Sequence, residues 1–173
     1  MKFRDIKPFH TYGNYRIDVP LLHVPSQIEQ WKEEMGLIME PDFQRSYVWT
    51  ERQQIAYVEF LLREGRSGRD ILFNHTKWET FQSADDGYFV CVDGLQRTTA
   101  IIRFIHNEIK AFGYSLSDYE DRHLMNRITL KFHVNSLPDR KSVLEWYLQL
   151  NAGGTVHTES DLERVRLLLR NEC

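Results

Sequence analysis

Two periods of hydrophobic and polar residues run along the chain, and each predicts one kind of element. Apolar and polar residues alternate from 128 to 134. This two-residue period is typical of a half-buried strand, and it would turn His133 toward solvent. Short runs rich in apolar residues at 70–74 and 88–92 indicate two further, more buried strands. Weaker strand signals lie at 20–24 and 37–39.

Helices are predicted where apolar residues recur at intervals of three and four. The segments with this period are 26–35, 50–65, 98–109, 138–151 and 159–170. Two of these segments open on the pattern of a capping box. The capping boxes pair Ser26 with Glu29 and Thr50 with Gln53. Gly36 and Gly65 mark two helix ends. The order of elements predicts a mixed α/β fold that becomes helical toward its C-terminus.

Length, charge and cysteine content narrow the class of protein. A chain of 173 residues has the length of one domain, and 42% hydrophobic residues can form a packed core. We therefore predict a single domain over residues 1–173. A net charge of −3 argues against a uniformly basic nucleic-acid coat. The charged N-terminus lacks the apolar region of a signal peptide, and no apolar run approaches the roughly 18 residues of a membrane span. With two cysteines, a disulfide framework is not indicated, so we expect a cytoplasmic protein without membrane contact.

The most informative segment is 93–100, with the sequence Asp-Gly-Leu-Gln-Arg-Thr-Thr-Ala, because it joins a predicted strand to a predicted helix. Gly94 lets the backbone approach a ligand, and the first turn of a helix offers free N–H groups to an anion. Arg97 adds a planar fork of donors that matches phosphate. Asp93 is placed to hold a metal ion, a ribose hydroxyl or Arg97. These residue types predict a phosphate site, and the structural alternative is an ordinary strand-to-helix turn.

Two other segments carry residue types that bind ligands. The loop at 41–49 contains Gln44 and Arg45, and its Tyr47 and Trp49 could stack on a base or wall a pocket. The run at 151–157 carries two glycines that could wrap a ligand. The structural alternatives are a packed aromatic loop and a helix C-cap.

Taken in this order, the three segments resemble the DUF262 domain, the N-terminal module of GmrSD-type restriction enzymes and of a phosphorothioate-sensing defence protein. That domain is similar to the ParB/sulfiredoxin-like fold, a small mixed sheet with flanking helices. The resemblance covers a core of about residues 19–169, and it implies nucleotide binding and hydrolysis, with DNA as the wider target. The residues that match the family's motifs are Asp93, Gly94, Leu95, Gln96 and Arg97, the upstream pair Gln44 and Arg45, and Asn151 with Gly153.

Two departures from the family pattern change the expectation. Leu95 stands where the family has Gln, which removes one polar contact and is expected to tune affinity or nucleotide choice. None of the seven histidines lies in the His-Asn-His arrangement of an HNH nuclease, the C-terminal domain of the restriction-type relatives. We therefore expect a stand-alone module from a phage or mobile element.

The resemblance leads to a specific hypothesis for the chemistry. Arg97, Thr98 and the backbone N–H groups of the turn would hold the phosphates of a nucleoside triphosphate, with ATP or GTP expected. Asp93 would orient Arg97, the magnesium shell or the attacking water, and Gln96 would position that water. Arg45 would stabilise charge that develops on the transferred phosphoryl group. We expect Mg²⁺ to arrive with the phosphates, because the histidines are not at zinc spacing and no metal ligand set is predicted in the chain.

Other classes of function stay open. The small size and acidic charge also fit a non-catalytic binding module, or a decoy that inhibits a host restriction or defence system through a protein partner. A direct DNA nuclease would use the loop at 63–69 with Lys77 as the wall of a basic groove. Sulfiredoxin-type chemistry needs a cysteine within the turn, and Cys91 lies before it on a strand expected to be buried.

Overall fold

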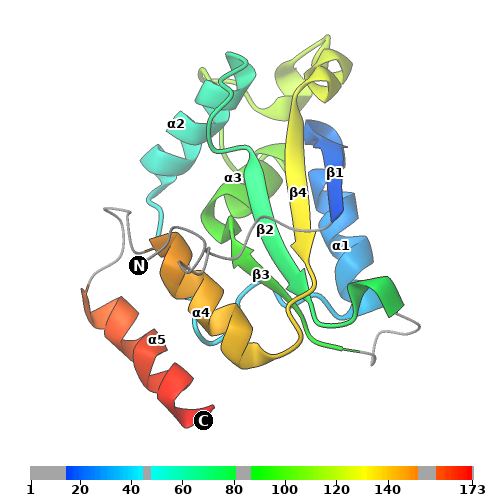
Figure 1. The fold of residues 1–173 in the computed structure, drawn as a ribbon. Coiled ribbons are helices and arrows are strands. Elements are labelled where there is room, and N and C mark those ends of the chain that lie inside the picture. The colour runs from blue at the N-terminus through cyan, green and yellow to red at the C-terminus, as the bar shows by residue number, and fades with distance from the viewer. Residues whose placement is uncertain (1–14, 45–47, 81–86, 152–158, 173) are drawn as a thin grey trace, which may run out of the picture.

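The described part of the chain forms a four-stranded mixed sheet with helices against both faces (Figure 1). The computed structural model describes residues 15–44, 48–80, 87–151 and 159–172. The strands are β1 (Tyr15–Pro20), β2 (Asp70–His75), β3 (Phe89–Asp93) and β4 (Thr129–Asn135). Their order is β1-β4-β2-β3, in which β2 and β4 are parallel and the two outer pairs are antiparallel. The predicted mixed α/β fold is confirmed.

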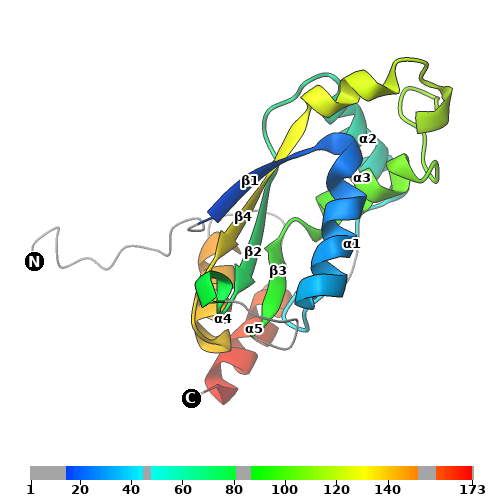
Figure 2. The same cartoon turned by 90° about the vertical axis from the view of Figure 1, so that its right-hand side faces the viewer.

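The helices divide between the two faces of this sheet. They are α1 (Val24–Met35), α2 (Glu51–Leu62), α3 (Leu95–Ile105), α4 (Arg140–Asn151) and α5 (Glu159–Asn171). Figures 1 and 2 show α1 along one face, with α4 and α5 on the other. Helix α2 packs against α3 through a separate, smaller cluster of buried apolar side chains. Among the helices of the described residues, none is both long enough and apolar enough to cross a membrane.

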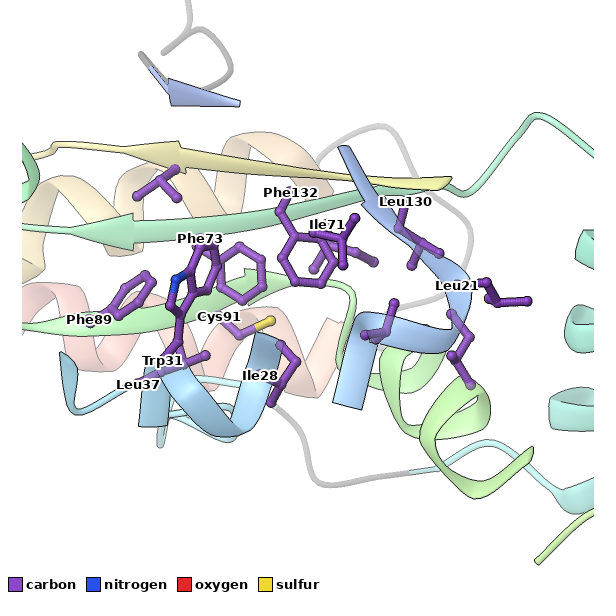
Figure 3. Close-up of a cluster of buried hydrophobic side chains, with 14 of the residues drawn as sticks. Leu21, Ile28, Trp31, Leu37, Ile71, Phe73, Phe89, Cys91, Leu130 and Phe132 are labelled. Atoms are coloured by element: carbon purple, nitrogen blue, oxygen red, sulfur yellow. The ribbon is translucent and has the colours of Figure 1, made fainter. Parts of the chain in front are cut away.

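Each face of the sheet buries its own set of side chains. Trp31 of α1 packs against Phe73 and Phe132, with ring centroids 5.1 and 5.6 Å away. Figure 3 shows these rings gathered between α1 and the sheet. On the opposite face, Leu72 and Val92 pack against residues of α4 and α5. The side chains of β2 alternate between the two clusters, as the two-residue period of a strand requires.

Two predicted helix boundaries are confirmed, and both follow from local chemistry. The Thr50 hydroxyl accepts a hydrogen bond from the Gln53 N–H, and the Gln53 side chain accepts one from the Thr50 N–H at 2.8 Å. This reciprocal pair begins α2. Gly36 ends α1 in the left-handed conformation, with φ of 66°.

The predicted start of α1 is wrong. The helix begins at Val24, and the Ser26 hydroxyl donates to the carbonyl of His23 at 2.9 Å instead of capping the helix. Pro25 suits the first turn, where no intrahelical N–H bond is needed. The strand predicted at 20–24 is also wrong, because β1 ends at Pro20 and a 3-10 turn then leads into α1.

Three other boundaries differ from the prediction. Residues 37–39 contribute a single bridge, between Ile38 and Val90, to the sheet. Helix α2 ends at Leu62, before the predicted Gly65. Helix α3 starts at the turn itself and spans Leu95–Ile105, where 98–109 was predicted. The backbone N–H of Thr98 donates to the carbonyl of Gly94, so residues 94–98, predicted as a turn before the helix, already form its first turn.

The prediction that His133 faces solvent is wrong. His133 is 8% exposed, and its Nε2 lies 2.7 Å from a carboxylate oxygen of Asp70. Strand β4 lies between β1 and β2 in the sheet. His133 is buried beside Asp70 of the neighbouring strand β2, whereas Lys131 on the same face of β4 is exposed, so alternation alone does not predict exposure.

Candidate functional site

The turn between β3 and α3 is built around Gly94. Its φ is 120°, a conformation that favours glycine, and an added Cβ would lie 2.7 and 2.8 Å from side-chain atoms of Ile71. Gly94 is the N-cap of α3 and supplies no side-chain cap. The first-turn N–H groups and the positive end of the helix dipole therefore meet at this turn, an arrangement that attracts anions.

Arg97 lies on the first turn of α3, and its guanidinium is fixed at two points. Its Nη1 donates to the carbonyl of Asp70 at 2.8 Å, and its Nη2 donates to the Asp93 carboxylate at 2.5 Å. The Asp93 side chain is 54% exposed, whereas that of Arg97 is 17% exposed. The structure thus brings a carboxylate, a guanidinium and a helix N-terminus together, as the sequence predicts.

Tyr57 and the loop before β2 form one side of this arrangement. The Tyr57 hydroxyl donates to the carbonyl of Gly68 at 2.7 Å, and a Cβ on Gly68 would lie 3.8 Å from Cδ of Arg97. Burial raises the pKa of Tyr57 to about 12, although the nearby guanidinium groups of Arg97 and Arg69 oppose this. Tyr57 is therefore a neutral phenol at pH 7, where it anchors the loop and does not titrate.

The upstream loop is tied to the turn on both sides of the segment 45–47. The Gln44 side chain donates to the carbonyl of Cys91 at 2.7 Å. The Gln96 side-chain oxygen accepts from the backbone N–H groups of Val48 and Trp49 at 3.0 and 2.9 Å. Gln96, predicted to position a water, therefore uses its carbonyl oxygen to hold this loop. Two residues of the predicted site or loop, Arg45 and Tyr47, lie outside the described residues.

Trp49 serves as a packed anchor of this loop. Its carbonyl accepts from the Gln54 side chain at 3.1 Å, and its ring lies 5.5 Å from that of Tyr57, edge to face. It also packs against the cluster between α2 and α3. This geometry corresponds to the aromatic loop that was the structural alternative for this segment.

Thr98 and Asn151 use their side chains within their own helices. The buried Thr98 hydroxyl bonds to the carbonyls of Gly94 and Leu95, each at 3.0 Å. The Asn151 side chain donates to the carbonyl of Tyr147 at 2.7 Å, at the end of α4. Gly153, which follows, lies outside the described residues.

The structure separates the two parts of the predicted basic groove wall. The loop at 63–69 precedes β2 and Lys77 follows it, so they lie at opposite ends of that strand. The Arg63 guanidinium packs over the ring of Phe112 at 5.1 Å, and the Arg69 side chain donates to the carbonyl of Gly65. These contacts hold the loop in place and do not form a common wall with Lys77.

The described residues contain neither a reactive thiol nor a preformed cluster of metal ligands. Cys91 is fully buried, and burial raises the pKa of its thiol, which disfavours the reactive thiolate. Within the described ranges, no three His, Cys, Asp or Glu side chains gather closely enough to hold a metal ion.

Sequence reasoning missed two residues that shape the site, Asp70 and Arg164. Asp70 holds Arg97 through its backbone carbonyl and His133 through its carboxylate. Arg164 of α5 binds the backbone carbonyls that lead into Gln44. Neither of these residues belongs to a local motif, so no pattern in the sequence marks them.

The fold and the turn together define a mixed α/β domain with an arginine-bearing glycine turn between a buried strand and a helix. The chain matches the family model described as GmrSD restriction endonuclease, N-terminal domain, over residues 28–168, and it belongs to that family. The predicted family is confirmed, and it relates the chain to restriction systems. No curated protein and no solved structure gives a significant match.

Proposed function

We propose that this protein binds a nucleoside triphosphate at the β3–α3 turn and hydrolyses it. The observation that carries the proposal is the fixed guanidinium of Arg97 beside an uncapped helix N-terminus. A planar guanidinium and backbone N–H groups are the donors that phosphate oxygens need. We take ATP and GTP as the first candidates. The family supports a restriction setting, in which hydrolysis would accompany the sensing or nicking of DNA.

In this proposal, the residues of the turn and of the loop beside it have separate roles. Arg97 and the first-turn N–H groups bind phosphate oxygens and stabilise the charge that develops during transfer. Asp93 orients Arg97 through their ion pair, and its exposed carboxylate can meet a magnesium ion or the attacking water. Gln44 and Gln96 hold the loop that carries Arg45, the proposed second cation.

Magnesium fits this donor set as a partner of the phosphates. Mg²⁺ usually binds through one or two carboxylates together with phosphate oxygens, and it would neutralise charge on the β and γ phosphates. Asp93 is the carboxylate of this turn that would meet it. No preformed cluster of protein ligands is required for this mode of binding.

The test is phosphate release from ATP, GTP, CTP and UTP with Mg²⁺, in the presence and absence of plasmid DNA. We expect Arg97→Ala to lower turnover by about 10²–10³-fold, because one donor to the transition-state charge is lost. Arg103→Ala is the matched control. Arg103 lies six residues further along α3 and is also ion-paired, to Glu51 and Glu108, so its loss tests the helix without removing a group of the turn.

The result that contradicts the proposal is specific. If Arg97→Ala melts like the wild type and turns over nucleotide at the wild-type rate, Arg97 is not part of the site. If both variants lose turnover equally, the effect belongs to the stability of α3. Relaxation of the plasmid in the same tubes would add nicking to the activity.

A second candidate is a binding module without catalysis. It is favoured by the internal bonds of two predicted catalytic residues, since the Gln96 oxygen holds the loop and Arg97 is held by Asp70 and Asp93. Such a module would bind nucleotide or a protein of a restriction or defence system and release no product. Nucleotide binding without phosphate release would therefore select this candidate.

A further inference from the structure

The backbone at residues 42–44 is held by one side chain from the last helix. Arg164 Nη1 donates to the carbonyl of Asp42 at 3.0 Å. Its Nη2 donates to the carbonyls of Phe43 and Gln44, at 3.2 and 3.0 Å. Three consecutive carbonyls therefore converge on a single guanidinium, directly before Arg45.

The same backbone segment also contacts α4. The Asp42 carboxylate accepts from Arg140 at 2.8 Å, and this hydrogen bond holds the pKa of Asp42 below its usual value. Phe43 is fully buried, and its ring lies 5.2 Å from that of Tyr147, edge to face. The α4–α5 hairpin therefore holds residues 42–44 through charge, packing and backbone hydrogen bonds together.

Gln44 connects α5 to the candidate site through two hydrogen bonds. Its backbone carbonyl accepts from Arg164, while its side chain donates to the carbonyl of Cys91, two residues before Asp93. Gln44 thus lies between α5 on one side and the end of β3 on the other. A shift of α5 would therefore move Gln44 relative to the end of β3.

We propose that Arg164 is a positioning residue of the phosphate site, which holds Gln44 against the end of β3, directly before the β3–α3 turn. This inference rests on the proposed nucleotide function and adds α5 to the elements that build the site. A lysine can replace the arginine only in part, because a single ammonium group lacks the rigid fork that reaches three carbonyls.

The experiment compares Arg164→Met, Arg164→Lys and the matched control Arg170→Met. Arg170 lies on the same helix with its side chain exposed. The probes are Mg-ATP, Mg-GTP and a non-hydrolysable analogue of each, and the readouts are Kd, kcat and KM. Hydrogen exchange of the peptide 41–50 in the free protein is measured in parallel, with the melting temperature as a check on folding.

We expect Arg164→Met to speed exchange in the peptide 41–50 and to weaken nucleotide binding about tenfold. The melting temperature should change little, because an exposed contact contributes little to global stability. Arg164→Lys should recover part of the loss, and Arg170→Met should match the wild type. A KM that rises with little change in kcat would mark a residue that positions the binding loop.

Two outcomes separate this inference from the proposed function. If wild type and Arg164→Met bind nucleotide equally, or exchange in the peptide 41–50 is unchanged, the positioning role is wrong and the phosphate site stands. If the wild type binds no nucleotide, the proposed function fails and the positioning role falls with it. Faster exchange in Arg164→Met would then show only that α5 holds this loop.

Discussion

Gly94 is the residue on which the geometry of the candidate site depends. An alanine there meets a strained φ of 120° and two atoms of Ile71 closer than 3.0 Å. Gly113→Ala is the matched control, because its φ is 82° and nothing lies within 4 Å of the new Cβ. We expect Gly94→Ala to lower the free energy of unfolding by about 1–3 kcal/mol more than Gly113→Ala, the cost of overpacking. Urea denaturation of both variants measures this difference. If both variants lose the same free energy of unfolding, the Ile71 side chain moves aside without an energetic penalty.

The residues of the turn could be predicted from sequence because their signals are local. Asp93, Gly94 and Arg97 lie within five positions of one another, at a change from strand to helix period. The groups that fix Arg97 and Gln44 are remote by comparison. Arg97 reaches Asp70 across 27 positions, and Arg164 reaches Gln44 across 120. One sequence carries no signal for such pairs, because any surface arginine has the same local pattern.

At the scale of elements, two capping patterns that look alike in sequence behave differently in the structure. Thr50 makes both bonds of a capping box at α2, whereas Ser26 lies inside α1 and bonds to His23. We expect Thr50→Ala to lower the free energy of unfolding by about 1 kcal/mol. Ser26→Ala should stay within about 0.5 kcal/mol of the wild type. Chemical denaturation measures both, and a loss at Ser26 as large as that at Thr50 would contradict the assigned start of α1.

The sequence predicts the buried strands well, but it does not predict the start of α1 or the burial of His133. The strands at 70–74 and 88–92 were found because a buried strand is a short apolar run between polar loops. The start of α1 was missed because the helix begins at Val24, with Pro25 in its first turn, before the capping pattern. The burial of His133 was missed because a single strand does not show which strands will flank it.

At the scale of the whole molecule, the sheet separates two cores of different extent. The cluster beneath α1 joins residues from all four strands, whereas the cluster beneath α4 and α5 takes its sheet residues from β2 and β3. Fewer strands share the second cluster, so the α4–α5 hairpin should open at a lower free energy than the sheet. The loop at 42–44 contacts this hairpin, and it should become exposed in the same opening.

Native-state hydrogen exchange of two core variants tests this order of opening. Val165→Ala removes two methyl groups from the second cluster, which should cost about 1–2 kcal/mol. We expect faster exchange in α5 and in the peptide 41–50, with the amides of β2 and β4 unchanged at low denaturant. Leu130→Ala in the first cluster should speed exchange everywhere. If Val165→Ala speeds the sheet amides as much as those of α5, the molecule opens as one unit. If it does not, the segment that carries Gln44 into the candidate site belongs to the less stable part of the fold, where a bound nucleotide or partner would shift the equilibrium most.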